Sequence, residues 1–380
     1  MDYKKVSLEE HEKLKGKIEM TNKITPTNKE DLSIYYSPGV AEPCREIIDD
    51  PDNAYKYTRK GNTIAVVSDG SAVLGLGNIG ALAGLPVMEG KAMLFKTFGG
   101  INAVPIVLKF QDPEDIIMAV ENISPGFGGI NLEDIKAPNC FIVEEELKKR
   151  LDIPVFHDDQ HGTAIVVLAA LTNALKVVGK KKEKIKIAML GAGSAAIAIA
   201  RLLIEWGVKH IVMVDTKWAL HQGRTVNMNK YKEDFVFYNL NNERGDIHNV
   251  IEGADVFIGV TTGSLLTKDD IKKMNDKPIV FAMSNPTPEI MPEEAIEGGA
   301  HIVATWRSDY PNQVNNVLVF PGMFKGALDA RIKQFTDEHF LAAAHALADY
   351  IKEPTPEYII PSVFDEGIAD MVANAVKKVG

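Results

Sequence analysis

The chain has 380 residues, of which 46% are hydrophobic and 25% are charged, a composition typical of a globular protein and not of a disordered one. This length exceeds that of one simple core and predicts two or three domains. The formal net charge of −10 argues against nucleic acid or an anionic membrane as the partner.

The two cysteines and the N-terminal segment help to predict the cellular compartment of the protein. Cys44 and Cys140 cannot build a disulfide framework, which favours a reducing environment. The N-terminal segment has no apolar core of the kind that a signal peptide needs. The longest apolar segment starts at Ala164, and polar residues such as Asn173 and Lys176 interrupt it, so it is not expected to span a bilayer. The sequence predicts a soluble, cytoplasmic protein.

The predicted elements alternate along the chain. Ser7 and Glu10 match a capping box that would open a short charged helix. From "TIAVVSDG" to "IPVFHDD", β-rich runs alternate with helical stretches, and a long helix is predicted over residues 163–178. The rhythm restarts with "KIKIAMLG" and ends in a helical tail from Phe324. This alternation predicts an α/β fold with largely parallel sheets.

Two glycine motifs resemble dinucleotide fingerprints, but only one has the right context. The motif "GAGSAA" lies between a predicted strand and a predicted helix, and Asp215 ends the next strand 24 positions after its first glycine. In "GLGNIG" the glycines are Gly75, Gly77 and Gly80, and the next β-like run ends without an acid, so a glycine-rich turn is expected. The residues predicted to contact the dinucleotide are Gly191, Ala192, Gly193, Ser194, Ala195 and Ala196.

Asp215 bears on the choice of dinucleotide. A carboxylate at this strand tip accepts hydrogen bonds from ribose hydroxyls and repels a 2′-phosphate, which slightly favours NAD. Lys217 and Arg224 follow closely, so NADP stays open.

Two pairs of acids follow neighbouring predicted strands. Glu133 and Asp134 come one β–α unit before Asp158 and Asp159. The second pair alone could simply cap a helix. Because parallel strands end at one sheet edge, however, both pairs can face one crevice, and carboxylates without arginine partners require a cation. Oxygen ligands suit Mg²⁺ or Mn²⁺, with His157 and His161 as hydrogen-bonding neighbours. A nicotinamide cofactor together with a divalent cation points to oxidative decarboxylation of a hydroxy acid.

The sequence resembles malic enzymes of the short bacterial form. The shared stretches are "YYSPGVAEPC", "SDGSAVLGLGNIG", "LPVMEGKAML", "LEDIKAPNCF", "FHDDQHGTA", "LGAGSAAIAIARLL", "MSNPTPE" and "NQVNNVLVFPG", in the family's order over residues 34–322. The resemblance implies conversion of (S)-malate to pyruvate and CO₂ with NAD or NADP and Mn²⁺ or Mg²⁺, in a homodimer. It also implies an N-terminal catalytic domain with the metal site over residues 1–160, and a Rossmann-type NAD(P)-binding domain with C-terminal helices over residues 161–380.

The same resemblance implies roles for single residues. The metal ligands would be Glu133, Asp134 and Asp159, with Asp158 as a supporting carboxylate of the catalytic set. Lys91 would be the catalytic lysine and Tyr36 the proton donor. Asn285 and Asn316 would meet cofactor and substrate, with Lys91 also contacting substrate.

Lys91 and Tyr36 each have a plainer interpretation. A lysine is most often exposed and without a catalytic role, but Lys91 lies between the apolar runs "LPVM" and "AML". Burial and a nearby cation would lower its pKa from about 10.4 towards neutrality, which would make it a base for the malate hydroxyl. Tyr36 could instead pack beside the turn at Pro38 and Gly39.

The chain also departs from its family. Ala72 stands where long eukaryotic relatives carry an arginine for a substrate carboxylate, so Ser71 and the asparagines are expected to take that role. Trp218 follows the cofactor acid where relatives often have a small residue. The alternatives left open are a plain malate or lactate dehydrogenase, a malolactic decarboxylase that retains its NAD, and a catalytically silent nucleotide sensor.

Overall fold

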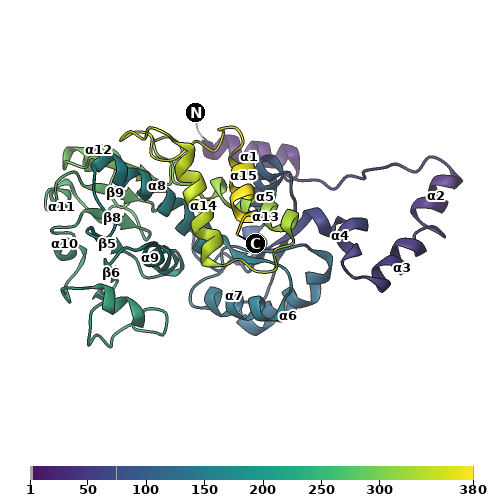
Figure 1. Ribbon diagram of the computed structural model, residues 1–380, viewed down its shortest axis with the longest axis horizontal. Helices are drawn as coiled ribbons and strands as arrows, with labels where there is room; N and C mark the ends of the chain where they lie inside the picture. Colours follow the sequence, from purple (N-terminus) through teal and green to yellow (C-terminus); the bar gives the residue numbers. More distant parts are fainter. Residues whose placement is uncertain (1–2, 74, 380) are drawn as a thin grey trace.

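The computed structural model describes residues 3–73 and 75–379, which form two parallel sheets joined by a buried helix (Figure 1). The first sheet has four parallel strands in the order β2-β1-β3-β4, and helices α5, α6 and α7 belong to the same part of the chain. The bounds are β1 Thr63–Ser68, β2 Asn102–Val107, β3 Ile130–Leu132, β4 Val155–His157, α5 Gly80–Gly99, α6 Pro113–Ile123 and α7 Asn139–Arg150. Strand β1 reads "TIAVVS" and is buried throughout, as expected for a strand covered on both faces.

The second sheet has six strands in the order β10-β9-β8-β5-β6-β7, and all pairs are parallel except β6 with the short β7. Its strands are β5 Lys186–Leu190, β6 His210–Asp215, β7 Trp218–Ala219, β8 Val256–Gly259, β9 Ile279–Ala282 and β10 Ile302–Thr305. Its helices are α9 Ser194–Trp206, α10 Ile247–Val250, α11 Lys268–Ile271 and α12 Pro292–Glu297. The strand order reverses at β5, and ligands of open α/β sheets bind at such a switch point.

Helix α8, Thr163–Val178, is the centre of the core and coincides with the predicted helix. Thirteen of its sixteen residues are buried, because it packs against α9, α14 and the turn that precedes it. By length and composition the segment Asp158–Val178 could cross a membrane, but 78% of its apolar window is buried inside the protein. Its apolar composition is therefore that of a core helix.

The C-terminal helices connect the two halves of the molecule. They are α13 Phe320–Ala330, α14 Asp337–Tyr350 and α15 Ile368–Lys377. Helix α13 packs against α15 and α5, whereas α14 packs against α8. Phe320 and Phe324 of α13 contact Phe95 of α5, with ring centroids 4.5 and 5.5 Å apart. The tail that follows the second sheet thus returns to the first.

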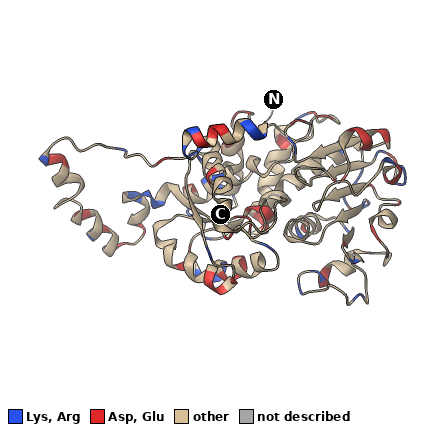
Figure 2. Cartoon of the chain, turned by 180° about the vertical axis from the view of Figure 1, so that it is seen from behind, with Lys and Arg blue, Asp and Glu red and all other residues tan. Residues whose placement is uncertain are grey.

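The N-terminal segment leaves the body as an extended arm. Helix α1, Tyr3–Leu14, begins four residues before Ser7, so the predicted capping box at that residue is wrong. Helices α2 Lys29–Tyr35, α3 Ala41–Asp49 and α4 Asn53–Tyr57 follow, and α2 and α3 lie at the far end of the arm (Figure 1). Seen from behind, acidic and basic residues lie on the arm as well as over the body (Figure 2).

We expect Asn173 to hold the C-terminal region onto α8. Its buried amide donates to the carbonyl oxygens of Ala348 and Ile359, at 2.9 and 3.0 Å. Asn173→Leu would leave both carbonyls without a donor and should lower the free energy of unfolding by about 1–3 kcal/mol. Urea denaturation measures the change. The control is Asn122→Leu, since the exposed Asn122 amide bonds only within its own helix and its loss should have little effect. Equal effects of the two substitutions would contradict this role.

Candidate active site

The two acid pairs meet at one edge of the first sheet. Strands β3 and β4 are parallel neighbours in which Leu132 pairs with His157. Both strands end at that level, so Glu133 and Asp134 follow one strand directly and Asp158 and Asp159 follow the other. The predicted convergence of the two pairs is confirmed.

Three of these acids form a group with the geometry of a cation site. Carboxylate oxygens of Glu133, Asp134 and Asp159 lie within 4.8 Å of one another. The backbone N–H of Asp134 donates to Asp159 Oδ2 at 2.8 Å, and the Asn131 amide donates to Glu133 Oε2 at 2.9 Å. The buried Oδ2 of Asp134 has no hydrogen-bond partner among the described residues. An all-oxygen set with an unpartnered atom fits Mg²⁺ or Mn²⁺.

The raised pKa values of these three carboxyl groups also favour a bound cation. Burial, followed by repulsion from the neighbouring acids, raises the pKa of Asp134 to about 9. Burial likewise raises the pKa of Glu133 to about 7 and that of Asp159 to about 6, although Lys91 opposes both shifts. Each carboxylate is thus destabilised in its charged form, and a dication between them would reverse that effect.

Lys91 lies beside the acids on the inner face of α5. Its side chain is 8% exposed, and its Nζ lies 2.5 Å from Asp158 Oδ2 and 3.0 Å from Glu133 Oε1. Burial alone would lower the pKa of Lys91, but the charges of Asp158 and Glu133 outweigh it and raise the pKa above its usual value. The lowered pKa expected beside a cation stays a prediction, because without a cation the two acids in direct contact determine the direction of the shift.

Asp158 connects Lys91 to the C-terminal half. The Asn316 amide donates to the same Asp158 oxygen that Lys91 contacts, while Asp158 Oδ1 has no partner among the described residues. Burial raises the pKa of Asp158 to about 7. The π-helical turn Asp158–Gly162 brings Gly162 so close that a Cβ there would lie 1.9 Å from Asp158 Oδ1. Gly162 therefore leaves the space in which this carboxylate sits.

The two histidines of the motif differ in their surroundings. His161 Nε2 bonds to Glu144 Oε1 at 2.7 Å, as expected of a hydrogen-bonding neighbour. His157 is fully buried, and burial lowers its pKa to about 4. Neither ring nitrogen of His157 hydrogen bonds to a described residue. Glu144 was not identified from the sequence, since it lies inside an ordinary-looking charged helix.

Ser71 does not have a free hydroxyl for a substrate carboxylate. Its Oγ donates to Asp69 Oδ1 at 2.6 Å and accepts from the N–H of Lys136 at 2.9 Å. The suggestion that Ser71 replaces the missing arginine is therefore wrong. Ala72 is exposed, and its N–H donates to the carbonyl oxygen of Asp134.

The second glycine motif has the geometry of a dinucleotide site. Gly191 follows β5 with a φ of 132°, and a Cβ there would lie 3.1 Å from Thr261 and Val260 side chains. Gly193 precedes α9, and the space where its Cβ would be is open. Ser194, Ala195 and Ala196 form the first turn of α9, where backbone N–H groups and the helix dipole favour a pyrophosphate.

Asp215 has cationic partners at the tip of β6. Arg224 and Lys232 donate to its two oxygens at 2.6 and 2.8 Å, and Asn227 donates at 2.9 Å. These bonds outweigh the effect of burial and lower the pKa of Asp215. A cavity of about 850 Å³ adjoins it, lined in part by Lys217, Trp218, Arg224 and Arg244. Lys232 and Asn227 were not identified from the sequence, because the loop that carries them folds back on the strand tip.

Asn285 lies where the two halves meet. It follows β9 in an exposed loop, and a Cβ at Gly75 would lie 2.7 Å from its carbonyl oxygen. The motif "GLGNIG" is thus a turn against this loop, outside the sheet that carries the dinucleotide fingerprint; residue 74 lies outside the described residues.

Tyr36 is the one predicted catalytic residue that a single chain does not bring to the site. It directly follows α2 on the arm, and its side chain is 72% exposed. Its hydroxyl hydrogen bonds to no residue that the structure describes.

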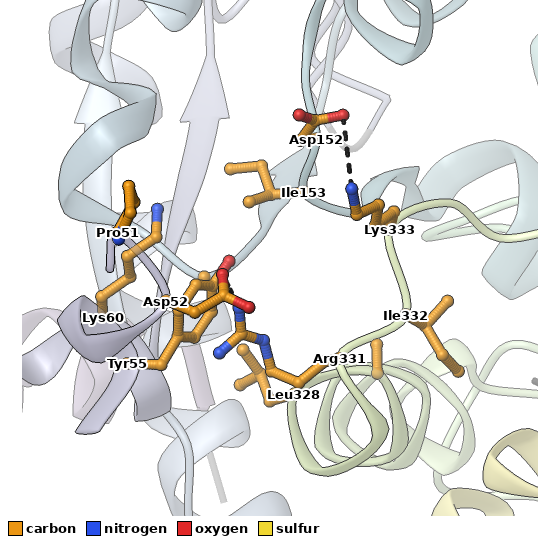
Figure 3. Close-up of a pocket in the computed structure, with 12 residues that line it drawn as sticks. Pro51, Asp52, Tyr55, Lys60, Asp152, Ile153, Leu328, Arg331, Ile332 and Lys333 are labelled. Carbon is orange, nitrogen blue, oxygen red and sulfur yellow. Dashed lines mark hydrogen bonds and ion pairs between the residues drawn. The ribbon is translucent and has the colours of Figure 1, made fainter. Parts of the chain in front are cut away.

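A separate pocket of about 290 Å³ lies at the root of the arm (Figure 3). Arg331 lies over the Tyr55 ring and bonds to Asp52 at 2.8 Å, and Lys333 lies 3.9 Å from Asp152. This pocket contains none of the predicted site residues, and these cations are all paired.

Comparison with known proteins agrees with the geometry. The malic enzyme N-terminal domain matches residues 14–115, and the malic enzyme NAD binding domain matches residues 160–379. The chain belongs to the malic enzyme family. The predicted family, α/β fold class and oxidoreductase class are confirmed.

Relatives of this family resemble the chain over nearly its whole length. A bifunctional malic/malolactic enzyme of Bacillus subtilis is 53% identical over 381 residues, covering 100% of this chain and 93% of its own. An NAD-dependent malic enzyme of Geobacillus stearothermophilus is 54% identical and covers 95% of this chain and 76% of its own. The crystal structure of an NAD-dependent malic enzyme from Thermotoga maritima matches with a TM-score of 0.95 at 50% identity, over 98% of both chains.

The raised pKa values predict how stability depends on pH. Between pH 7 and 9, the unfolded chain has ionised carboxylates, whereas the folded protein takes up protons at Glu133 and Asp134, with pKa values of about 7 and 9. The stability that these protons contribute is lost as pH rises, so the melting temperature of the metal-free protein should fall across this window. The raised pKa of Lys91 does not act here, because the lysine is charged in both states.

Melting curves with and without Mg²⁺ test this prediction. Mg²⁺ should remove the loss, because it stabilises the ionised carboxylates, and Asp134→Asn should flatten the profile without metal. Asp152→Asn, at an exposed carboxylate, is the matched control and should follow the unmodified protein. A melting temperature that rises from pH 7 to 9 without metal would contradict the assignment.

Proposed function

We propose that the protein catalyses the oxidative decarboxylation of (S)-malate to pyruvate and CO₂ with NAD or NADP and a divalent cation. One observation supports this proposal above the others. The buried amine of Lys91 contacts Asp158 at the same sheet edge as the three-carboxylate group. A base beside a cation site, at the junction with a dinucleotide fold, suits substrates that lose a hydride and then CO₂.

The proposed ligands of the cation are Glu133, Asp134 and Asp159. When bound, the dinucleotide supplies a hydride acceptor, and the divalent cation supplies a positive charge that polarises substrate oxygens and stabilises an enolate. Gly191, Gly193 and the first turn of α9 would hold the dinucleotide pyrophosphate, and Asp215 its ribose. Asn285 and Asn316 would contact cofactor and substrate.

Lys91 and Asp158 would together remove the proton of the malate hydroxyl. Asp158 would first accept a proton from the ammonium group of Lys91, which requires a carboxyl pKa near neutrality, and the neutral amine would then take the proton of the malate hydroxyl. Burial gives Asp158 a pKa of about 7. Asn316 donates to Asp158 and fixes the orientation of its carboxylate. After CO₂ leaves, enolpyruvate needs a proton on its methylene carbon, and we propose Tyr36 as its donor.

A malolactic reaction is a second candidate. The Bacillus subtilis relative, 53% identical, is named a bifunctional malic/malolactic enzyme. In that reaction malate gives lactate and CO₂ with no net NADH, so the products distinguish the two activities.

We also propose that the protein is a homodimer and that it lies in the cytoplasm. We propose further that the boundary between its two domains lies near residue 160. The bare arm helices support the homodimer, and the reducing environment favoured by the two cysteines supports the compartment.

A product assay with metal-site variants tests the function. We expect malate to give equal amounts of CO₂, pyruvate and reduced cofactor, and only with Mn²⁺ or Mg²⁺. Asp159→Asn should lose most of this rate and most Mn²⁺ binding by calorimetry, because it removes a ligand charge with little change in volume. Asp152→Asn is the matched control and should retain both. Full rate in excess chelator would contradict the metal role, whereas lactate without NADH would identify the malolactic reaction.

Asp215→Ala should change the choice of cofactor. We expect a modest preference for NAD, because the Asp215 carboxylate would accept a ribose hydrogen bond. Its removal should weaken NAD about tenfold relative to NADP, which corresponds to one charge-assisted hydrogen bond. Steady-state kinetics with both cofactors provide the ratio. A strong NADP preference before mutation would show instead that Arg224 or Lys217 reads the 2′-phosphate.

A further inference from the structure

Trp218 has a backbone conformation that a bulky residue rarely adopts. Its φ is 79°, in the left-handed region that favours glycine and asparagine. Its side chain is 66% exposed, so the indole ring does not fill the core in return for this strain. Strained residues persist only where the surrounding structure holds them, and they cluster at ligand sites. The conformation of Trp218 therefore points to a ligand that contacts its ring.

Trp218 also lies next to the acid that would bind the ribose of the dinucleotide. It is the residue opposite Asp215 in the antiparallel ladder between β6 and β7. Directly opposed residues in such a ladder have Cβ atoms about 5 Å apart. The adenine ring of a dinucleotide is bonded directly to that ribose. A ribose held by Asp215 would thus bring its base within reach of the indole.

The cavity of about 850 Å³ beside Asp215 has two exposed apolar side chains in its lining. They are Trp218 and Val226, of which Val226 is 61% exposed. Apart from two glycines, the other lining residues are polar or charged. This lining suits a flat ring with apolar faces and polar edges, because its faces can contact the apolar side chains while its edge nitrogens meet polar groups.

Arg224 fixes both apolar residues relative to Asp215. Its Nη2 donates to Asp215 Oδ1 at 2.6 Å, and its Nη1 donates to the carbonyl oxygen of Trp218 at 2.7 Å. Its Nε donates to the carbonyl oxygen of Val226 at 2.9 Å. One guanidinium group therefore holds the acid and both apolar residues in place before a ligand binds. Such preorganisation reduces the entropy that binding costs.

We propose that the indole ring of Trp218 stacks on the adenine ring of the dinucleotide, with Val226 as a second apolar contact in the same cavity. The inference rests on the proposed function, in which Asp215 binds the ribose that carries this base. Stacking uses the face of the base and not the 2′ substituent of the ribose. Trp218 therefore contributes affinity for NAD and NADP alike, whereas Asp215 discriminates between them.

Binding of ADP-ribose, which has the adenine end without the nicotinamide, tests the contact by calorimetry. Trp218→Asn removes the ring and introduces a residue that tolerates a positive φ. It should weaken ADP-ribose binding at least about tenfold, without a lower melting temperature. Trp218→Phe keeps an aromatic face and should retain the affinity within about threefold. Phe237→Ala is the matched control, because that ring is 67% exposed and lies outside the cavity lining, and its binding should not change.

Two further measurements separate stacking from a general effect on the fold. In steady-state kinetics, the loss in Trp218→Asn should appear as a higher KM for NAD and for NADP, by similar factors, and much less in kcat. The indole fluorescence of the unmodified protein should fall when ADP-ribose is added, because a stacked base quenches indole emission. Trp218→Phe should abolish this fall, although the chain keeps its other two tryptophans.

Three results would overturn the proposal. They are unchanged ADP-ribose affinity in Trp218→Asn, an equal loss in Phe237→Ala, and a fluorescence change that persists in Trp218→Phe. If Trp218→Asn does not fold, the fluorescence of the unmodified protein and of Trp218→Phe decides. Failure of the proposed function is distinguishable, because the protein would then bind ADP-ribose through Trp218 without decarboxylating malate.

Discussion

The repulsion among buried carboxylates at the end of β3 and β4 is the constraint on which the rest of the site depends. Glu133, Asp134, Asp158 and Asp159 sit together with one lysine, so their summed charge is not balanced within the chain. Isolated buried charges are costly, and a protein retains such a group only when a partner offsets the cost. Lys91 offsets part of it through Asp158 and Glu133. The negative charge that Lys91 does not offset can attract a dication. The same repulsion therefore favours metal binding and destabilises the folded protein when no metal is bound.

The same constraint explains the architecture around the acids. Parallel strands end at one edge, so two ordinary β–α units bring four acids together without any unusual loop. Gly162 leaves room for Asp158, and Asn316 reaches it from the chain beyond the second sheet. The helical tail then returns to α5 and packs behind Lys91 through Phe320, whose ring lies 4.2 Å from the amine. Residues from three distant parts of the sequence thus fix one ion pair.

The sequence was sufficient where local pattern and topology coincide. Strand–glycine–helix order identified the fold around Gly191, and the acid pairs at successive strand ends identified the edge where they meet. The sequence alone did not predict contacts between side chains that are far apart in the chain and meet only in the folded protein. The sequence did not show the contact of Lys91 with two acids, which raises the lysine pKa when no cation is present, or the loop that brings Lys232 and Asn227 to Asp215. Ser71 has a suitable hydroxyl, but only its neighbours show that the hydroxyl is occupied.

Helix α8 also has a mechanical consequence. It begins at the turn that carries Asp158 and Asp159, and it is buried along most of its length. A helix packed in this way moves as a rigid body with the acids at its start. Its C-terminal end is different, because Gly179 has a left-handed φ of 71° and the lysine-rich segment before β5 follows. The chain therefore passes at Gly179 from the rigid helix that holds the acids to the segment that leads into the second sheet, so this turn sets the direction in which β5 begins.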